Sequence, residues 1–183
     1  MSIRHSLLAL LVEGDAYGNQ LRTAFEDRTG GTWPLNIGQV YQTLDRLVRD
    51  GLVATSDGAG VDLPPQARNL YSLTPAGRSE VARWFEEPVS RIPAPRDELS
   101  IKFALGLGLP GVDADAVLDA QRAASMRTLQ GLTVMRRQRV AQDASAARQP
   151  WMLVLDRLIF ETEAELRWLD HCHATLFTAE VPR

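Results

Sequence analysis

The chain has 183 residues and a mass of 20.3 kDa, with 45 % hydrophobic and 23 % charged residues. This ordinary globular composition excludes a disordered chain, a collagen and a polytopic membrane protein. The formal net charge of −3 lacks the basic excess that is typical of nucleic-acid-binding proteins, and taken alone it argues against that class.

Two features bear on location. Cys172 is the only cysteine, which excludes an intrachain disulfide and a four-cysteine zinc site and favours a reducing compartment. The apolar run at residues 6–12 is short, and Glu13 and Asp15 follow it without a small-residue cleavage site, which favours a buried helix over a signal peptide. No run approaches the roughly 18 apolar residues of a membrane span. We therefore expect a cytoplasmic protein without a membrane segment.

The first half of the chain predicts three short helices. Apolar residues at helical spacing indicate the first over residues 3–11, and Gly14 stops it. The second begins near Gly18 and ends around residues 30–31. Asn36 is a good N-cap for the third, and Gln39 three residues later completes a capping-box pattern. The apolar stripe of this third helix runs to Gly51.

Two strands and a further helix follow. Residues 52–56 and 69–73 are strand-like, and the Gly- and Pro-containing segment between them is typical of a hairpin tip. Thr74 and Pro75 then open a helix as N-cap and first helical residue. Three helices, a hairpin and another helix predict an N-terminal winged helix-turn-helix.

The second half of the chain reads as helices throughout. A proline-rich stretch at 88–95 predicts a linker, which divides the chain into a winged helix-turn-helix domain at 1–87 and a helical domain at 96–183. Helices are expected over residues 97–107, from Asp113 to about residue 143, and over residues 150–177. The fold class is therefore mainly α, with an all-helical C-terminal dimerisation domain.

The last helix carries an approximate heptad pattern, which favours packing against a second copy of the chain. The residues expected at this dimer interface are Trp151, Leu155, Leu158, Leu166, Leu169 and Leu176. Trp151 and Trp168 are the candidates for an aromatic effector pocket between subunits, although packing alone also explains tryptophans on such a helix.

One polar stripe on the third helix carries the functional hypothesis. Opposite its apolar residues lie Gln39, Gln42, Thr43 and Arg46, at helical spacing. Gln and Arg make bidentate contacts to adenine and guanine edges in the major groove, and the N-terminal half of a recognition helix reads the bases. The alternative, a merely solvated helix face, is less favoured because a helix pair precedes this helix and a hairpin follows it.

These motifs resemble the PadR family of transcriptional regulators. The resemblance rests on Tyr17-Gly18, on Gly38-Gln-Val-Tyr41-Gln-Thr-Leu44, on Asp50-Gly51-Leu52-Val53 and on Tyr71-Ser-Leu-Thr-Pro-Ala-Gly-Arg78. Arg96-Asp-Glu-Leu99 with Lys102, and Glu165-Leu-Arg-Trp168-Leu, resemble the helical C-terminal domain of the longer branch of this family. The resemblance implies a cytoplasmic homodimeric repressor that binds double-stranded DNA at an inverted repeat and is released by a small, often aromatic, effector.

The resemblance also assigns roles to individual residues. It implies phosphate contacts for Tyr41, Arg4 and His5, and an approach of the DNA backbone to the Gly18 region. Including the polar stripe, the expected DNA-binding residues are Arg4, His5, Gly18, Asn36, Gly38, Gln39, Tyr41, Gln42, Thr43, Arg46 and Arg68. The predicted hairpin tip carries two acidic residues and no basic one before Arg68, which leaves its contact with DNA open.

Other motifs have simpler explanations. Gly106-Leu-Gly108-Leu-Pro-Gly111 matches a dinucleotide fingerprint, but a helix rather than a strand precedes it. His171 and His173 flank Cys172, and adjacent helical residues point too far apart to share a metal ion. The basic cluster Arg136, Arg137 and Arg139 is expected on a solvated helix face. No nucleophile–base–acid set is present, so we expect no enzyme, no cofactor and no metal.

Two further function classes stay open: a winged-helix module that binds proteins instead of DNA, and a small-molecule carrier. The charge distribution motivates the first, because residues 1–87 hold 8 basic and 11 acidic residues, whereas residues 88–183 hold 12 of each. The third helix itself is neutral, with Arg46 and Arg49 against Asp45 and Asp50. The net charge therefore does not exclude DNA binding.

Overall fold

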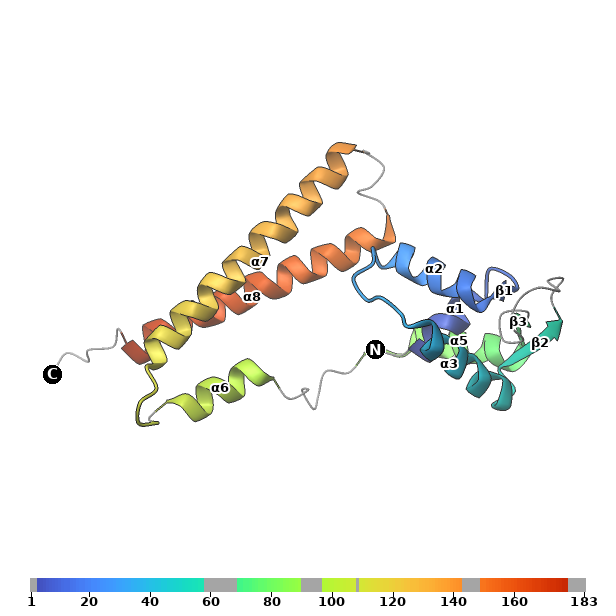
Figure 1. Cartoon of the computed structure of the whole chain (residues 1–183), viewed down its shortest axis with the longest axis horizontal. Coiled ribbons are helices and arrows are strands. Elements are labelled where there is room, and N and C mark those ends of the chain that lie inside the picture. Colours follow the sequence, from blue (N-terminus) through green and yellow to red (C-terminus); the bar gives the residue numbers. More distant parts are fainter. Residues whose placement is uncertain (1–2, 58–68, 90–96, 108, 143–148, 178–183) are drawn as a thin grey trace. The chain divides into compact units, whose positions relative to one another are not determined.

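A computed structural model describes residues 3–57, 69–89, 97–107, 109–142 and 149–177. The chain divides into two compact units, Met1–Val89 and Ser90–Arg183, and the division falls within the proline-rich segment 88–95 (Figure 1). Each unit is described by itself. Residues 58–68, which hold most of the expected hairpin tip together with Arg68, lie outside the described residues.

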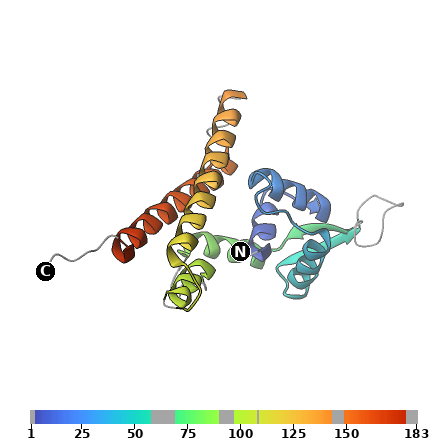
Figure 2. The same ribbon diagram turned by 60° about the vertical axis from the view of Figure 1, so that its left-hand side comes forward.

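The first unit contains the expected winged helix-turn-helix elements (Figures 1 and 2). In chain order they are α1 (Ile3–Leu10), β1 (Ala16–Tyr17), α2 (Gly18–Arg28), α3 (Ile37–Arg49), β2 (Val53–Asp57), β3 (Asn69–Leu73) and α5 (Pro75–Glu86). The strand order is β1-β3-β2, and both pairs are antiparallel, with Ala16 opposite Tyr71 and Val53 opposite Leu73. The two-residue strand β1 was not predicted from the sequence.

Local hydrogen bonds explain the helix boundaries of this unit. The Asn36 side chain accepts a hydrogen bond from the Gly38 N–H at 2.8 Å, and Thr74 Oγ1 accepts one from the Gly77 N–H at 3.0 Å. Both N-caps were predicted. The expected capping box at α3 is wrong, because no described hydrogen bond returns from Gln39. A side chain makes such a return bond at α2 instead, where Gln20 Oε1 accepts from the Tyr17 N–H at 2.9 Å.

The core of the first unit holds α3 in place. The apolar face of α3 is completely buried, since Val40, Leu44 and Leu47 are all 0 % exposed. They pack with buried leucines of α1 and with Leu21 and Phe25 of α2. At about 25 cal/mol per Å² of buried apolar surface, each such side chain contributes on the order of 2 kcal/mol. The opposite face of α3 is consequently left toward solvent.

All the elements of secondary structure described in the second unit are helices. It consists of α6 (Glu98–Gly106), α7 (Ala114–Gln142) and α8 (Pro150–Phe177), and α7 and α8 lie side by side (Figures 1 and 2). Asp97 caps α6 by accepting from the Leu99 N–H, and Asp113 accepts from the Ala116 N–H at the start of α7. None of the described helices is long and apolar enough to cross a membrane.

The contact between α7 and α8 combines apolar and polar groups. Phe103, Leu118 and Leu169 form a buried cluster. Further along, the Glu165 carboxylate accepts from the buried Ser125 hydroxyl at 2.6 Å and from the Gln121 amide at 3.0 Å. These bonds satisfy the polar groups that the helix contact removes from water.

This contact revises one expectation. Leu155, Leu166 and Leu169 are 5 %, 7 % and 0 % exposed within one chain, so they pack inside it and are not available to a second copy. The arginine cluster is exposed, as expected for a solvated helix face, although Arg136 Nε lies 2.6 Å from Asp156 Oδ1 and Arg139 lies over the Trp151 ring. The glycine motif at 106–111 begins at the last residue of α6, as expected for a helix end.

Candidate nucleic-acid interface

The outer face of α3 presents a polar surface to solvent. Gln39, Gln42 and Arg46 are exposed, and Thr43 is half-buried. The Thr43 hydroxyl donates to the Gln39 carbonyl at 2.7 Å, which leaves its methyl group and its acceptor lone pairs for an external partner. These four residues therefore lie on one accessible face, as predicted from the sequence and as a recognition helix requires.

One backbone donor at the start of α3 is already engaged within the protein. The Gly38 N–H is satisfied by the Asn36 side chain, and a Cβ at Gly38 would lie 3.2 Å from Asn36 Oδ1. A phosphate at this helix end would therefore compete with Asn36 for that donor. Asn36 itself is exposed, so its amide group is accessible beside Gln39.

Gly18 and Tyr41 fit together at the start of α2. Gly18 is buried, and a Cβ added there would lie 2.5 Å from Tyr41 Cε1, closer than any real contact. Tyr41 is half-buried and its ring packs on the core of the first unit. The structure thus gives Gly18 a steric role in seating the Tyr41 ring, which its sequence position did not reveal.

Arg4 and His5 on α1 have partners inside the molecule. Arg4 Nη1 lies 2.7 Å from Asp50 Oδ2, and both side chains are more than two-fifths exposed. His5 Nε2 lies 2.9 Å from Glu80 Oε1, and its ring stacks on Trp84 at 5.3 Å. Arg4 remains accessible to an external phosphate, whereas His5 primarily joins α1 to α5.

The His5 contact belongs to a small charged cluster on α5. Glu80 also pairs with Arg83, and Arg83 lies 3.3 Å from Glu87. Hydrogen bonds from Arg83 and then from His5 lower the pKa of Glu80 to about 2. Glu80 is therefore ionised at neutral pH, and its charge is compensated within the cluster.

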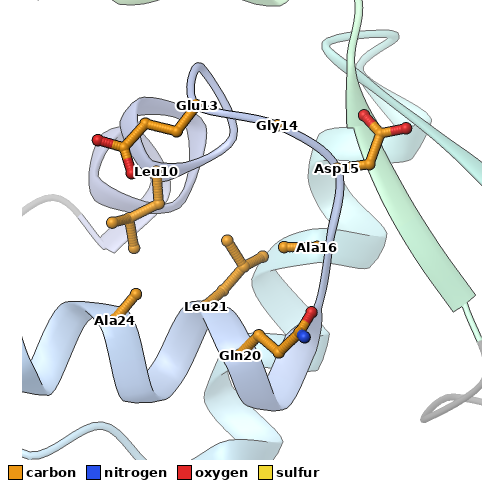
Figure 3. A pocket seen from close by; sticks show the side chains of 8 residues that line it. All are labelled: Leu10, Glu13, Gly14, Asp15, Ala16, Gln20, Leu21 and Ala24. Atoms are coloured by element: carbon orange, nitrogen blue, oxygen red, sulfur yellow. The ribbon is translucent and has the colours of Figure 1, made fainter.

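A hollow of about 230 Å³ lies between the end of α1 and the start of α2 (Figure 3). Leu10, Leu21 and Ala24 face it, whereas the Asp15 carboxylate points away. Its polar neighbours are already engaged, since Glu13 pairs with Arg28 at 2.5 Å and Gln20 caps α2. With Glu13 and Gln20 engaged and the Asp15 carboxylate directed away, this hollow is not a candidate site.

The two tryptophans proposed for an effector pocket lie apart. Trp168 packs edge-on against Phe103 at 5.7 Å, whereas Trp151 lies under Arg139. Seventeen residues of α8 separate them, which is about 25 Å along a helix, so they do not line one pocket within a chain. Among the described residues no group of three metal-ligating side chains could hold an ion, and His173 lies 3.6 Å from Asp115.

The N-terminal unit, with its buried inner face and polar outer face on α3, defines a winged helix-turn-helix protein of the kind that regulates transcription. The profile of the "Transcriptional regulator PadR-like family" matches residues 7–83, and that of the "Virulence activator alpha C-term" matches residues 95–176. The chain therefore combines a domain of the PadR-like family of transcriptional regulators with a C-terminal domain of the virulence-activator type. It is a regulator and not an enzyme, as the sequence predicted.

Relatives and solved structures support this assignment over most of the chain. A probable transcriptional regulator of Mycobacterium tuberculosis is 27 % identical over 93 % of this chain and 95 % of its own length. The negative transcriptional regulator PadR of Bacillus subtilis is 25 % identical over 70 % of this chain and 71 % of its own length.

The crystal structure of B. subtilis PadR with operator DNA matches this chain at a TM-score of 0.70 and 19 % identity. The match covers 96 % of this chain and 99 % of that one. A structure of the same protein with p-coumaric acid also has a TM-score of 0.70, at 19 % identity, and covers 96 % and 98 %. The Vibrio cholerae virulence activator AphA covers 96 % and 98 %, at a TM-score of 0.65 and 25 % identity. These matches include both halves of the chain, so they support the fold predicted for each half.

Proposed function

We propose that this protein is a cytoplasmic repressor that binds an inverted-repeat operator as a homodimer through α3. The observation that carries the proposal is the accessible polar stripe on α3, above an inner face that is completely buried. Such a helix is rigidly held and presents bidentate donors and acceptors, which is what reading of base edges requires. The relative of B. subtilis is named a negative regulator, which supports the sign of the regulation.

The residues divide into two roles. Gln39, Gln42 and Arg46 read base edges, since their side chains are long, exposed and carry the matching hydrogen-bonding groups. Tyr41 and Arg4 contact phosphates and fix the position of the domain on the duplex, which adds affinity for any sequence. Arg4 would exchange Asp50 for a phosphate at little cost, because exposed ion pairs are weak.

Dimerisation uses the surface of the second unit that the α7–α8 contact leaves uncovered. Leu153 and Phe160 lie seven residues apart on one side of α8 and are 74 % and 67 % exposed. Apolar side chains of this size at heptad spacing are stabilised by burial against another helix. A dimer would present two copies of α3 about 34 Å apart, one turn of DNA.

A small aromatic effector is proposed to release the DNA, because the B. subtilis protein has been crystallised with p-coumaric acid. The measurement is a titration with p-coumaric acid that follows tryptophan fluorescence and DNA affinity together. If the compound quenches fluorescence and lowers the affinity, it acts as an effector. If it quenches without changing the affinity, the small-molecule carrier hypothesis is favoured instead.

The central test is binding of the full-length protein to fragments of its own promoter region across a salt series. DNA binding through phosphates weakens steeply as salt rises, because each neutralised phosphate releases counterions. We expect a shift of the promoter fragment that weakens with salt and a smaller effect on random DNA. Absence of a shift at low salt would reject the proposal in favour of a protein-interaction module.

A further inference from the structure

The four tryptophans of the chain differ in the contacts that their rings make. Trp84 stacks on His5, Trp168 packs against Phe103, and Trp151 lies under Arg139. Trp33 is 41 % exposed, and no ring or cation contact is found for it among the described residues. The exposed part of this indole gives up stabilisation that burial would supply, because aromatic side chains gain much of their stabilisation from burial.

The turn that carries Trp33 is held in a defined conformation. Gly30 and Gly31 have φ values of +62° and +68°, a left-handed conformation that favours glycine. Glu26 of α2 ties the turn at two points: its carbonyl accepts from the Gly31 N–H at 2.8 Å and its carboxylate from the Leu35 N–H at 3.2 Å. Leu35 is buried, so the chain is anchored on both sides of the exposed indole.

The position of Trp33 along the chain places it beside the base-reading face. It lies three positions before Asn36, the N-cap of α3, so the two Cα atoms are within about 11 Å. On the proposed function, the first turns of α3 enter the major groove, and the sugar–phosphate strands that border the groove pass its N-terminal end. The indole is thus within reach of one of these strands.

The charge of the unit makes an uncharged contact valuable. Residues 1–87 are net acidic, and Arg4 is paired with Asp50 in the absence of DNA. An indole supplies one N–H donor for a phosphate oxygen and an apolar ring for the deoxyribose, and it adds no like-charge repulsion. Such a contact is independent of the base sequence.

We propose that Trp33 is a DNA-backbone contact of this protein, which packs its ring on a deoxyribose and donates its indole N–H to a phosphate next to the groove that α3 reads. The inference rests on the proposed function. It adds to that function a residue outside the recognition helix, and a means by which an acidic domain holds DNA.

The experiment compares the wild-type protein with Trp33→Ala and Trp33→Phe on the promoter fragment and on random DNA of the same length. Trp33→Ala is expected to lower affinity about fivefold per subunit, the equivalent of one hydrogen bond. The factor should be the same for both DNAs, and the salt dependence should be unchanged, because no charge is removed. Phe85→Ala, which removes a 69 % exposed aromatic side chain from α5, is the matched control and should have no effect.

Fluorescence supplies a second readout, compared between proteins of equal thermal stability. DNA should quench the emission of the wild-type protein, and the quenched component should be absent from Trp33→Phe at equal thermal stability. Unchanged affinity of Trp33→Ala, or equal quenching in Trp33→Phe, would overturn the Trp33 contact while leaving the proposed function intact. Failure of the wild-type protein to bind DNA at low salt would overturn both.

Discussion

Individual residues in the first unit have roles that only their three-dimensional neighbours reveal. Gly18 was expected to approach the DNA backbone, but its hydrogen side chain faces the Tyr41 ring. Its φ is not positive, so glycine is not required there for backbone conformation. The requirement is space, and it arises from a residue 23 positions later in the chain.

Gly18→Ala should therefore destabilise the protein by about 1–3 kcal/mol, the usual cost of overpacking, because Tyr41 has to leave its site. In a Tyr41→Ala background the same change should cost nothing, since the clash is gone. Urea denaturation of the four proteins of this double-mutant cycle measures the coupling. Equal costs of Gly18→Ala in both backgrounds would show that the Tyr41 ring does not set the requirement.

Glu80 predicts a pH dependence of stability. Its hydrogen bonds with Arg83 and His5 lower its pKa in the folded state to about 2, from an ordinary value of 4.5. A depressed carboxyl pKa stabilises the folded state above the unfolded value, and this stabilisation is lost as the pH falls from about 4.5 toward 2. The free energy of unfolding should decline over this range in the wild-type protein, and less steeply in Glu80→Gln. Glu86→Gln, an exposed change on the same helix, should follow the wild-type curve.

At the level of helices and strands, the sequence predicted what local chemistry determines. Asn36, Thr74, Asp97 and Asp113 hydrogen-bond the first turns of their helices, so the helix starts could be assigned from neighbouring residues alone. The strand β1 could not be predicted from neighbouring residues, because Ala16 and Tyr17 become a strand only by pairing with β3, more than 50 residues later.

The candidate site shows the same division. The polar stripe of α3 followed from helical spacing, because one face had to be buried. The partners of Arg4 and His5 could not be predicted from the sequence, since the packing of α1 on α3 and α5 brings Asp50 and Glu80 to them. The apolar pattern of α8 indicated a helix contact but not its partner, which is α7 of the same chain for Leu155, Leu166 and Leu169.

The recognition helix predicts separable effects of two adjacent residues on binding to the proposed operator. Tyr41→Phe removes the hydroxyl proposed to contact a phosphate but keeps the ring that packs against Gly18, so affinity for specific and random DNA should fall by the same factor. Gln42→Ala should lower specific binding alone, by about 1–3 kcal/mol for a lost bidentate contact. Competition assays with both DNAs measure, for each variant, the ratio of its affinity for specific DNA to its affinity for random DNA. A loss of discrimination in Tyr41→Phe would contradict this division.

For the whole molecule, the proposed function requires the two units to act together, because we expect one acidic domain to bind DNA weakly. Phosphate contacts supply most of the affinity for random DNA, and residues 1–87 hold 8 basic against 11 acidic residues. Coupling two such domains raises the effective concentration of the second, which strengthens binding by about 10²–10⁴ without any new contact. The exposed face of α8 is thereby linked to the affinity of α3.

Phe160→Asp places a charge in the centre of that exposed face and is expected to give a monomer, because an unpaired carboxylate is costly to bury at an interface. The fold of the chain should persist, since Phe160 is 67 % exposed and lies outside the buried contact of α7 with α8. Analytical ultracentrifugation should show half the wild-type mass, and affinity for the full operator should fall at least about a hundredfold, to that of a half-site. Phe85→Asp, on an exposed aromatic of the first unit, should stay dimeric. A Phe160→Asp protein that remains a dimer with full affinity would place the subunit contact elsewhere than the Leu153 and Phe160 face.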